Sequence, residues 1–122
     1  MNTTDVLRLM SDDTRIRVLM LLKEKSLCVS QMQQILNVPQ SMLSKHLAKL
    51  RDFELVKAIP DGKFMKYEIV QDSLLLSMLD TISQQGTDRE FKEDLAKIHD
   101  YDYILEACDQ CQLHAYRTRY IV

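Results

Sequence analysis

The chain has few cysteines, few glycines and no long hydrophobic run. Of its 122 residues, three are cysteine and two are glycine, while 46% are hydrophobic. An odd number of thiols in a chain with enough apolar residues for a core argues against a disulfide framework. No apolar run approaches the roughly 18 to 20 residues of a membrane span, and the N-terminus lacks a basic-then-apolar signal pattern. We therefore expect a cytoplasmic chain with reduced thiols and no membrane partner, large enough for one core.

The charge is distributed unevenly, although the net charge is only −2. Residues 40–66 hold six basic and three acidic side chains, a net charge of +3. Residues 70–122 hold five basic and ten acidic side chains, a net charge of −5. Phosphate groups are met by a local basic patch and not by the average charge of a protein. The sequence thus predicts one basic face, suited to nucleic acid, and an acidic opposite end.

Residues 29–50 predict two short amphipathic helices joined by a tight turn. In the first helix, Met32 and Ile35 have the spacing that lines one helical face. Asn37 then tolerates the left-handed backbone that ends a helix, and Pro39 suits the opening of the next one. The second helix is expected to bury three leucines: Leu43, Leu47 and Leu50.

The open face of this second helix carries amide, hydroxyl and ammonium groups, with no acid before Asp52. Amides and hydroxyls can read base edges in a major groove, and lysines meet phosphates. The two helices are a candidate helix-turn-helix, although such pairs also occur in all-helical domains. For His46, between the core stripe and the open face, packing and DNA contact remain equal alternatives. The candidate DNA-binding residues on this helix are Gln40, Ser41, Ser44, Lys45, His46 and Lys49.

A β-hairpin is predicted directly after the second helix. Asp61-Gly62 between two β-type runs is a strong short-range hairpin signal. In the second run, every other residue from Met65 onward is apolar, which predicts one apolar face. Lys63 at the tip and Lys66 beside it would contact phosphates. We therefore predict a mainly α fold with a small β-hairpin wing (α+β), a winged helix-turn-helix.

The segment after the hairpin predicts a helix with two apolar sides. Residues 74–82 contain six apolar residues in nine. Leu75 and Leu79 belong to one stripe, and Leu74 begins another. Such a helix must cover its own core and something else, and a second subunit is the economical partner. With a short N-terminal helix over residues 3–10, it is expected to form the contact of a homodimer.

With these parts placed, the chain resembles the ArsR/SmtB family of small dimeric winged-helix repressors. The resemblance covers roughly residues 5–85 and rests on LMSDDTRIRVLMLL, QSMLSKHLAKLRDFELV and DGKFMKYEI. It implies a homodimer that represses transcription at an inverted repeat in double-stranded operator DNA and releases it when an effector binds. The family typically shows Gln-x-x-(Val/Leu)-Ser-x-His-Leu, which is matched here by Gln40, Leu43, Ser44, His46 and Leu47.

This interpretation divides the chain into two parts. Residues 1–85 would form the winged helix-turn-helix domain for DNA binding and dimerisation. Residues 86–122 would form a C-terminal helical extension that carries a Cys-x-x-Cys pair. Its helix is expected to run from residue 88 to about 117, with a break near Asp100 as an alternative.

Two metal sites that the resemblance suggests are incomplete. The arsenic-sensing branch resembles Glu-Leu-Cys-Val-Cys-Asp-Leu before the third helix. Here Cys28 matches the first thiol, but Ser30 replaces the second, and a hydroxyl is a poor ligand for a soft ion. The zinc-sensing branch places Asp, His, His and Glu on the helix after the wing, whereas residues 72–85 contain no histidine.

The remaining candidate metal ligands lie near the C-terminus. Cys108 and Cys111 have the i, i+3 spacing that places both sulfurs on one side of a helix, and His114 follows within about one turn. With Cys28 they would supply the three thiolates that As(III) or Sb(III) prefers, whereas adding His114 would suit zinc or cadmium. We expect no cofactor to be required for DNA binding itself.

Other roles for these thiols stay open. Buried cysteine often packs as a small hydrophobic residue, which would leave a repressor without a metal site. Cys28 could instead join a C-terminal cysteine in a thiol-redox-sensing repressor. Catalytic Cys-x-x-Cys pairs sit at helix N-termini, where the dipole stabilises thiolate. The pair here is predicted late in a helix among acids, so we expect no enzyme.

Overall fold

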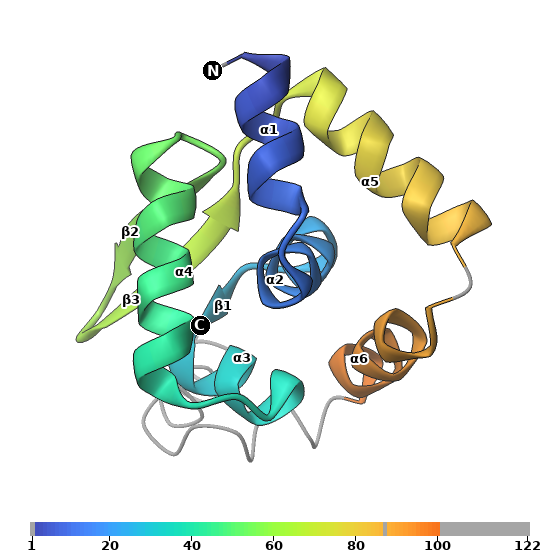
Figure 1. The fold of residues 1–122 in the computed structure, drawn as a ribbon. Helices are drawn as coiled ribbons and strands as arrows, with labels where there is room; N and C mark the ends of the chain where they lie inside the picture. The colour runs from blue at the N-terminus through green and yellow to red at the C-terminus, as the bar shows by residue number, and fades with distance from the viewer. Residues whose placement is uncertain (1, 87, 101–122) are drawn as a thin grey trace.

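The computed structural model describes residues 2–86 and 88–100. Over these residues the chain forms helices and one antiparallel sheet, so the predicted mainly α fold with a β wing is confirmed (Figure 1). The N-terminal half contains α1 (Thr3–Met10), α2 (Asp13–Glu24), β1 (Leu27–Cys28), α3 (Val29–Leu36) and α4 (Gln40–Asp52). The remainder contains β2 (Val56–Asp61), β3 (Phe64–Ile69), α5 (Ser73–Gln85) and α6 (Arg89–His99).

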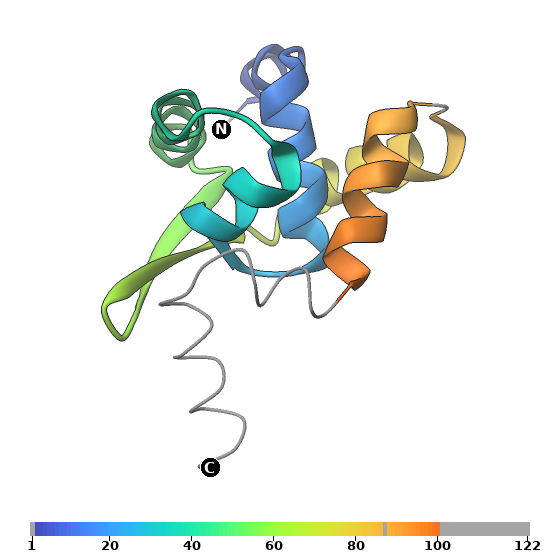
Figure 2. The same cartoon turned by 90° about the horizontal axis from the view of Figure 1, so that it is seen from below.

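Helix α2 is the centre of the fold. Its residues 18–22 are all buried, so the helix is covered nearly all round. In the ribbon it lies among α1, α3, α5 and α6 (Figures 1 and 2). Asp12 caps its first turn, because the side chain accepts a hydrogen bond of 3.0 Å from the Arg15 backbone N–H. A helix with apolar residues nearly all round packs at the centre of a domain, which accounts for the position of α2.

The sheet has the strand order β1-β3-β2. Strands β2 and β3 form the predicted hairpin, with Gly62 at φ 64° in its turn. Strand β1, which pairs Leu27 with Tyr67 and Cys28 with Lys66, was not predicted because two residues are too short for a periodic signal. The apolar face of β3 is buried only at its base. Met65 remains 43% exposed because the hairpin projects beyond the helices (Figure 2).

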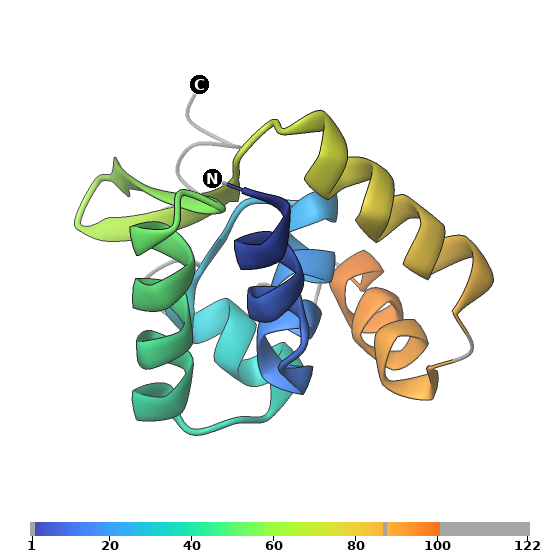
Figure 3. The same ribbon diagram turned by 45° about the horizontal axis from the view of Figure 1, so that its top comes forward.

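Helices α1 and α5 lie on the outer side of α2, with α1 between α4 and α5 (Figure 3). Leu75 and Leu79 of α5 are buried, whereas Leu74 is 44% exposed, as expected for a helix with two apolar sides. In α1, the apolar residues divide between the core and the surface. Leu9 is buried and Leu7 is 52% exposed, so α1 also carries an apolar side chain on its surface.

Helix α6 ends at His99, which agrees with the alternative of a break near Asp100. Phe91, Leu95 and Ile98 pack against the core cluster, so α6 is part of the same body as α2 and α3. The expected continuation to residue 117, with Cys108, Cys111 and His114, lies outside the described residues. No helix in the described part of the chain is both long and apolar enough to cross a membrane.

Candidate nucleic-acid interface

The turn between α3 and α4 has the geometry that its residues predict. Asn37 adopts the left-handed conformation with φ 56°, and its N–H donates to the Gln33 carbonyl at 2.8 Å. Pro39 precedes the first residue of α4, and its carbonyl accepts from the Leu43 N–H at 3.0 Å. The leucines of α4 that face the core are buried, as expected. The two helices are therefore a helix-turn-helix.

The outer face of α4 is open to solvent. Its side chains can donate and accept hydrogen bonds, and its lysines add positive charge. In the ribbon α4 forms one edge of the molecule, beside the projecting hairpin (Figures 1 and 3). The structure thus brings together, on one accessible helix, the predicted contact residues Gln40, Ser41, Ser44, Lys45 and Lys49, all of which are exposed.

His46 points instead toward the start of α2. Its Nδ1 lies 3.4 Å from Nη1 of Arg15, and its Nε2 lies 3.8 Å from Oδ1 of Asp12. Only 19% of the His46 side chain is exposed. Arg15 in turn donates from Nε to the Leu9 carbonyl at 2.8 Å. This geometry favours the packed alternative, in which His46 fixes α4 against the corner between α1 and α2.

The charge of Asp12 is stabilised at this corner. Partial burial acts to raise the pKa of its carboxyl, but the Arg15 backbone N–H, the charge of His46 and the Arg15 guanidinium oppose that effect. Their sum holds the pKa of Asp12 below its ordinary value. The carboxylate therefore both caps α2 and attracts the His46 ring of α4.

The wing carries one open lysine and one paired lysine. Lys63 is exposed at the tip of the hairpin. Nζ of Lys66 lies 3.3 Å from Oδ2 of Asp61 on the opposite strand. Because Ile59 is the register partner of Lys66, Asp61 is its diagonal neighbour, a distance that a long side chain can span. This pair was missed by the sequence reasoning, and only the hairpin register could have indicated it.

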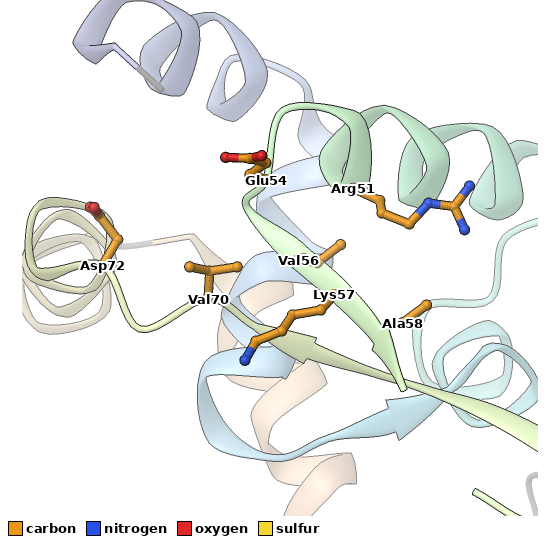
Figure 4. A pocket seen from close by; sticks show the side chains of 7 residues that line it. All are labelled: Arg51, Glu54, Val56, Lys57, Ala58, Val70 and Asp72. Atoms are coloured by element: carbon orange, nitrogen blue, oxygen red, sulfur yellow. The ribbon is translucent and has the colours of Figure 1, made fainter. Parts of the chain in front are cut away.

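A hollow at the base of the wing is chemically different from the outer face of α4. Val56, Ala58 and Val70 form its apolar part, and charged side chains surround it (Figure 4). Arg51 and Lys57 are balanced there by Glu54 and Asp72. A surface with two cations and two carboxylates has no preference for phosphate, so we do not count it as part of the basic face.

Cys28 is the one predicted metal ligand that the structure describes. It is 3% exposed, at the junction of β1 and α3, and its backbone N–H donates to Oε1 of Gln31 at 3.0 Å. Within residues 2–86 and 88–100, no group of three or more His, Cys, Asp or Glu side chains could hold a metal ion. The predicted ligands Cys108, Cys111 and His114 lie outside this part of the chain.

The fold and its open helix define a winged helix-turn-helix DNA-binding regulator, and the comparisons with known proteins identify the family. Residues 12–58 match the model of the bacterial regulatory protein arsR family. The chain belongs to the ArsR family. Its relatives are transcriptional regulators, so the expectation of a regulator rather than an enzyme is confirmed.

Three curated relatives illustrate the range of similarity. The HTH-type transcriptional regulator KmtR of Mycobacterium tuberculosis is 30% identical over 78 residues, which cover 64% of this chain and 60% of that protein. The arsenic resistance transcriptional regulator ArsR1 of Pseudomonas putida is 32% identical over 65 residues, covering 52% and 51%. The uncharacterized HTH-type transcriptional regulator MJ1325 of Methanocaldococcus jannaschii is 36% identical over 69 residues, covering 56% and 78%.

Among solved structures, HlyU from Vibrio cholerae shares the fold. Its TM-score is 0.65 at 25% identity, and the match covers 70% of this chain and 91% of that chain. A second structure, described as reduced HlyU, has the same TM-score and covers 88% of that chain. The match thus covers most of the HlyU chain, although the chain spans only 60% of KmtR.

Proposed function

We propose that this protein is a homodimeric repressor that binds an inverted repeat in double-stranded operator DNA through α4. The observation that carries the proposal is the outer face of α4, which is exposed and free of acidic side chains until Asp52. The face belongs to a helix-turn-helix and lies beside a wing that carries Lys63. Such a face fits a major groove, because amides and hydroxyls read base edges there. Such a repressor would act in the cytoplasm.

The side chains divide into two roles. Gln40, Ser41 and Ser44, near the N-terminus of α4, would contact base edges, since that end of a recognition helix enters the groove. Four lysines would contact phosphates and so set affinity without reading sequence. These are Lys45, Lys49, Lys63 and Lys66. His46, which was predicted among the contacts, would position α4 through its packing against Asp12 and Arg15.

The proposed dimer contact uses α1 and α5. Leu7 and Leu74 present large apolar side chains to solvent on these helices. Covering them with the same patch of a second copy would remove both from water in one symmetric contact. Two copies would then hold their α4 helices for half-sites about one helical turn, roughly 34 to 36 Å, apart.

For induction, we propose that a thiophilic ion binds at Cys108 and Cys111, with Cys28 and His114 as further ligands. Thiolates are the preferred ligands of As(III) and Sb(III), and a set that includes histidine suits zinc or cadmium. One relative is named as an arsenic resistance regulator, which supports arsenite as the first ion to test. Bound ion would favour a dimer geometry that cannot span both half-sites, and a ligand shifts such an equilibrium only by its differential affinity.

A thiol-redox switch is the second candidate for induction. One structural relative is described as reduced HlyU, which supports testing the redox state of the thiols in this chain. In this chain, oxidation would join Cys28 to Cys108 or Cys111. Because Cys28 is buried, such a disulfide would require local opening at the start of α3.

The test begins with selection of the preferred sequence from a random pool of duplex DNA, followed by fluorescence anisotropy on the selected duplex. We expect an inverted repeat, and an affinity that falls steeply with salt because phosphate contacts release counterions. Lys45→Met should lower the slope of log K against log salt by about one. The control is Lys92→Met, which removes an exposed lysine of α6 and should leave the slope unchanged. A salt-independent affinity, or no enriched sequence, would refute DNA binding by this face.

The effector is tested on the same complex. Arsenite, zinc, cadmium and a mild oxidant are added separately to reduced protein on DNA. Release by arsenite that Cys108→Ser/Cys111→Ser abolishes would support the proposed ion site. Release by the oxidant alone would favour the redox switch, and no release by any of them would refute both.

A further inference from the structure

Helix α6 carries a buried carboxylate that the DNA interface does not use. Asp94 and Gln31 are the polar residues that the structure buries among those it describes. Nε of Arg17 donates to Oδ2 of Asp94 at 2.8 Å, and Nη2 of the same guanidinium donates to Oδ1 at 2.9 Å. This is the bidentate geometry that gives strong, directional charge-assisted hydrogen bonds. Asp94 thereby fixes the orientation of Arg17 on α2.

Arg17 and Lys97 both reach the end of α3. Nη2 of Arg17 also donates to the Leu36 carbonyl at 3.2 Å. Nζ of Lys97 donates to the Ile35 carbonyl at 3.1 Å. These carbonyls belong to the last turn of α3, where no intrahelical donor is available, and where positive charge is favourable to the helix dipole. Two cations therefore cap α3 from outside.

The capped end is the point where α3 meets the turn to α4. Three residues, 37–39, separate the two helices of the helix-turn-helix. Asn37 is already committed to the left-handed conformation, and its N–H donates to Gln33. A short turn with fixed dihedral angles transmits any shift in the last turn of α3 directly to the first turn of α4. The position of Gln40 and Ser41 thus depends on how α3 is held.

Apolar packing already holds α6 against the core, and the ionic contacts fix its orientation there. Phe91, Leu95 and Ile98 join α6 to the core, and α6 lies beside both α2 and α3 (Figure 2). Burying an ion pair gains little net stability, since the desolvation of two charges offsets their attraction. What such a pair supplies is a defined geometry. The hydrogen bonds of Arg17 and Lys97 specify the geometry of the end of α3.

We propose that Asp94 and Lys97 are positioning residues for DNA binding. Helix α6 holds the end of α3 directly through Lys97 and indirectly through the Asp94–Arg17 pair, and this orients α4 for insertion into the major groove. This inference rests on the proposed DNA interface. It makes α6 an intramolecular control element of the helix-turn-helix. Neither residue contacts DNA in this mechanism, so their effect on affinity is independent of phosphate contacts.

The test compares Lys97→Met with Lys97→Arg and uses Glu93→Gln as the matched control. Met keeps the length of the Lys97 side chain without its donors, Arg keeps a donor, and Glu93 pairs with Arg89 in an exposed contact on the same helix. On the selected duplex, we expect Lys97→Met to weaken binding about threefold to tenfold and Asp94→Asn about tenfold to thirtyfold. Lys97→Arg should retain most of the wild-type affinity, and Glu93→Gln should leave the affinity unchanged.

Two further measurements separate positioning from a direct contact and from general destabilisation. The salt slope of Lys97→Met should equal that of the wild type, whereas a slope lowered by about one would make Lys97 a phosphate ligand and overturn the proposal. Amide exchange in the DNA-free protein should accelerate at Asn37 in Lys97→Met but not across α2. Fully folded Asp94→Asn and Lys97→Met proteins with wild-type affinity would also overturn it. If the wild type binds no DNA, the proposed function itself fails.

Discussion

The Nε2 atom of His46 lies 3.8 Å from Oδ1 of Asp12, and this contact joins the middle of α4 to the N-cap of α2. The same Asp12 oxygen accepts the Arg15 N–H at 3.0 Å. The Asp12 carboxylate therefore caps the N-terminus of the central helix α2 and also contacts α4, the helix that we assign to the major groove. The stability of this corner should depend on the ionisation of Asp12.

Asp12→Asn tests that dependence, because Asn caps a helix about as well as Asp but carries no charge. The pKa of Asp12 is lowered in the folded state, so its negative charge stabilises the fold above the ordinary value of 3.8. That contribution is lost as the pH falls through the lower folded-state pKa. Urea midpoints should show the variant less stable at pH 7, by a difference that shrinks as the pH falls below the ordinary pKa of Asp12. An equal difference at every pH would assign the effect to the cap alone.

Asp61→Asn on the wing should strengthen DNA binding. The substitution removes a carboxylate from a surface proposed to face phosphates, and it releases Lys66 from an ion pair at 3.3 Å. A partly exposed pair is worth about 0 to 1 kcal/mol, so the fold should lose little. Anisotropy should show an affinity gain of about two- to fivefold that shrinks as salt rises. Glu93→Gln, the same change of charge on α6, is the control, and an equal gain there would remove the wing from the explanation.

The end of α4 offers a test of backbone strain. Glu54 adopts φ 62°, its N–H donates to the Arg51 carbonyl at 2.9 Å, and the Leu55 N–H donates to the Leu50 carbonyl at 2.9 Å. This is a Schellman motif with a non-glycine residue in the left-handed position. Glu54→Gly should stabilise the fold by about 0.5 to 1 kcal/mol in thermal or urea unfolding, because the left-handed conformation costs an L-residue about 1 to 2 kcal/mol.

The matched substitution is Asn37→Ala, which should destabilise the fold. Asn37 has nearly the same conformation, φ 56°, but Asn tolerates it better than Ala. Stabilisation by Asn37→Ala, or destabilisation by Glu54→Gly, would contradict the assignment of strain to these two positions.

The parts of the fold that the sequence predicted are those with local signals. Asn37 and Gly62 each stand where a particular backbone conformation is needed, and residue type alone indicates it. The buried and exposed faces of α4 follow from helical periodicity in the same way. These local signals were sufficient to place the helix-turn-helix and its wing.

The parts that could not be predicted depend on tertiary packing. Arg17 and Asp94 are 77 positions apart, and nothing in either neighbourhood indicates a partner. Strand β1 exists because Leu27 and Cys28 pair with β3, not because of their own propensities. His46 likewise lay at the border of two helical faces, and only the position of α2 decides which way its ring points.

Cys28 should react slowly in the folded protein. In a Cys108→Ser/Cys111→Ser background it is the remaining thiol of the chain, and it is 3% exposed. An aromatic disulfide reagent should label it rapidly in denaturant and at a much lower rate without denaturant, since only the opened protein exposes the sulfur. Equal rates in both conditions would show that Cys28 is accessible, which would strengthen its proposed role as an ion ligand or redox partner.

Leu74→Glu should convert the proposed dimer into a monomer without unfolding it. Leu74 is 44% exposed in a single chain, so a charge there costs the monomer little, whereas in a symmetric contact two carboxylates would be buried against the apolar patch of α1 and α5. Sedimentation velocity at micromolar concentration should show a dimer for the wild type and a monomer for the variant. Met65→Glu on the wing, with 43% exposure, is the control and should remain a dimer.

The Leu74→Glu monomer should bind DNA with a single half-site as weakly as the wild type does. On the full operator it should lack the extra affinity that the wild-type dimer gains from the second half-site, because only the dimer links two contacts in one association step. A wild-type monomer with full operator affinity would contradict the use of α1 and α5 as the subunit contact.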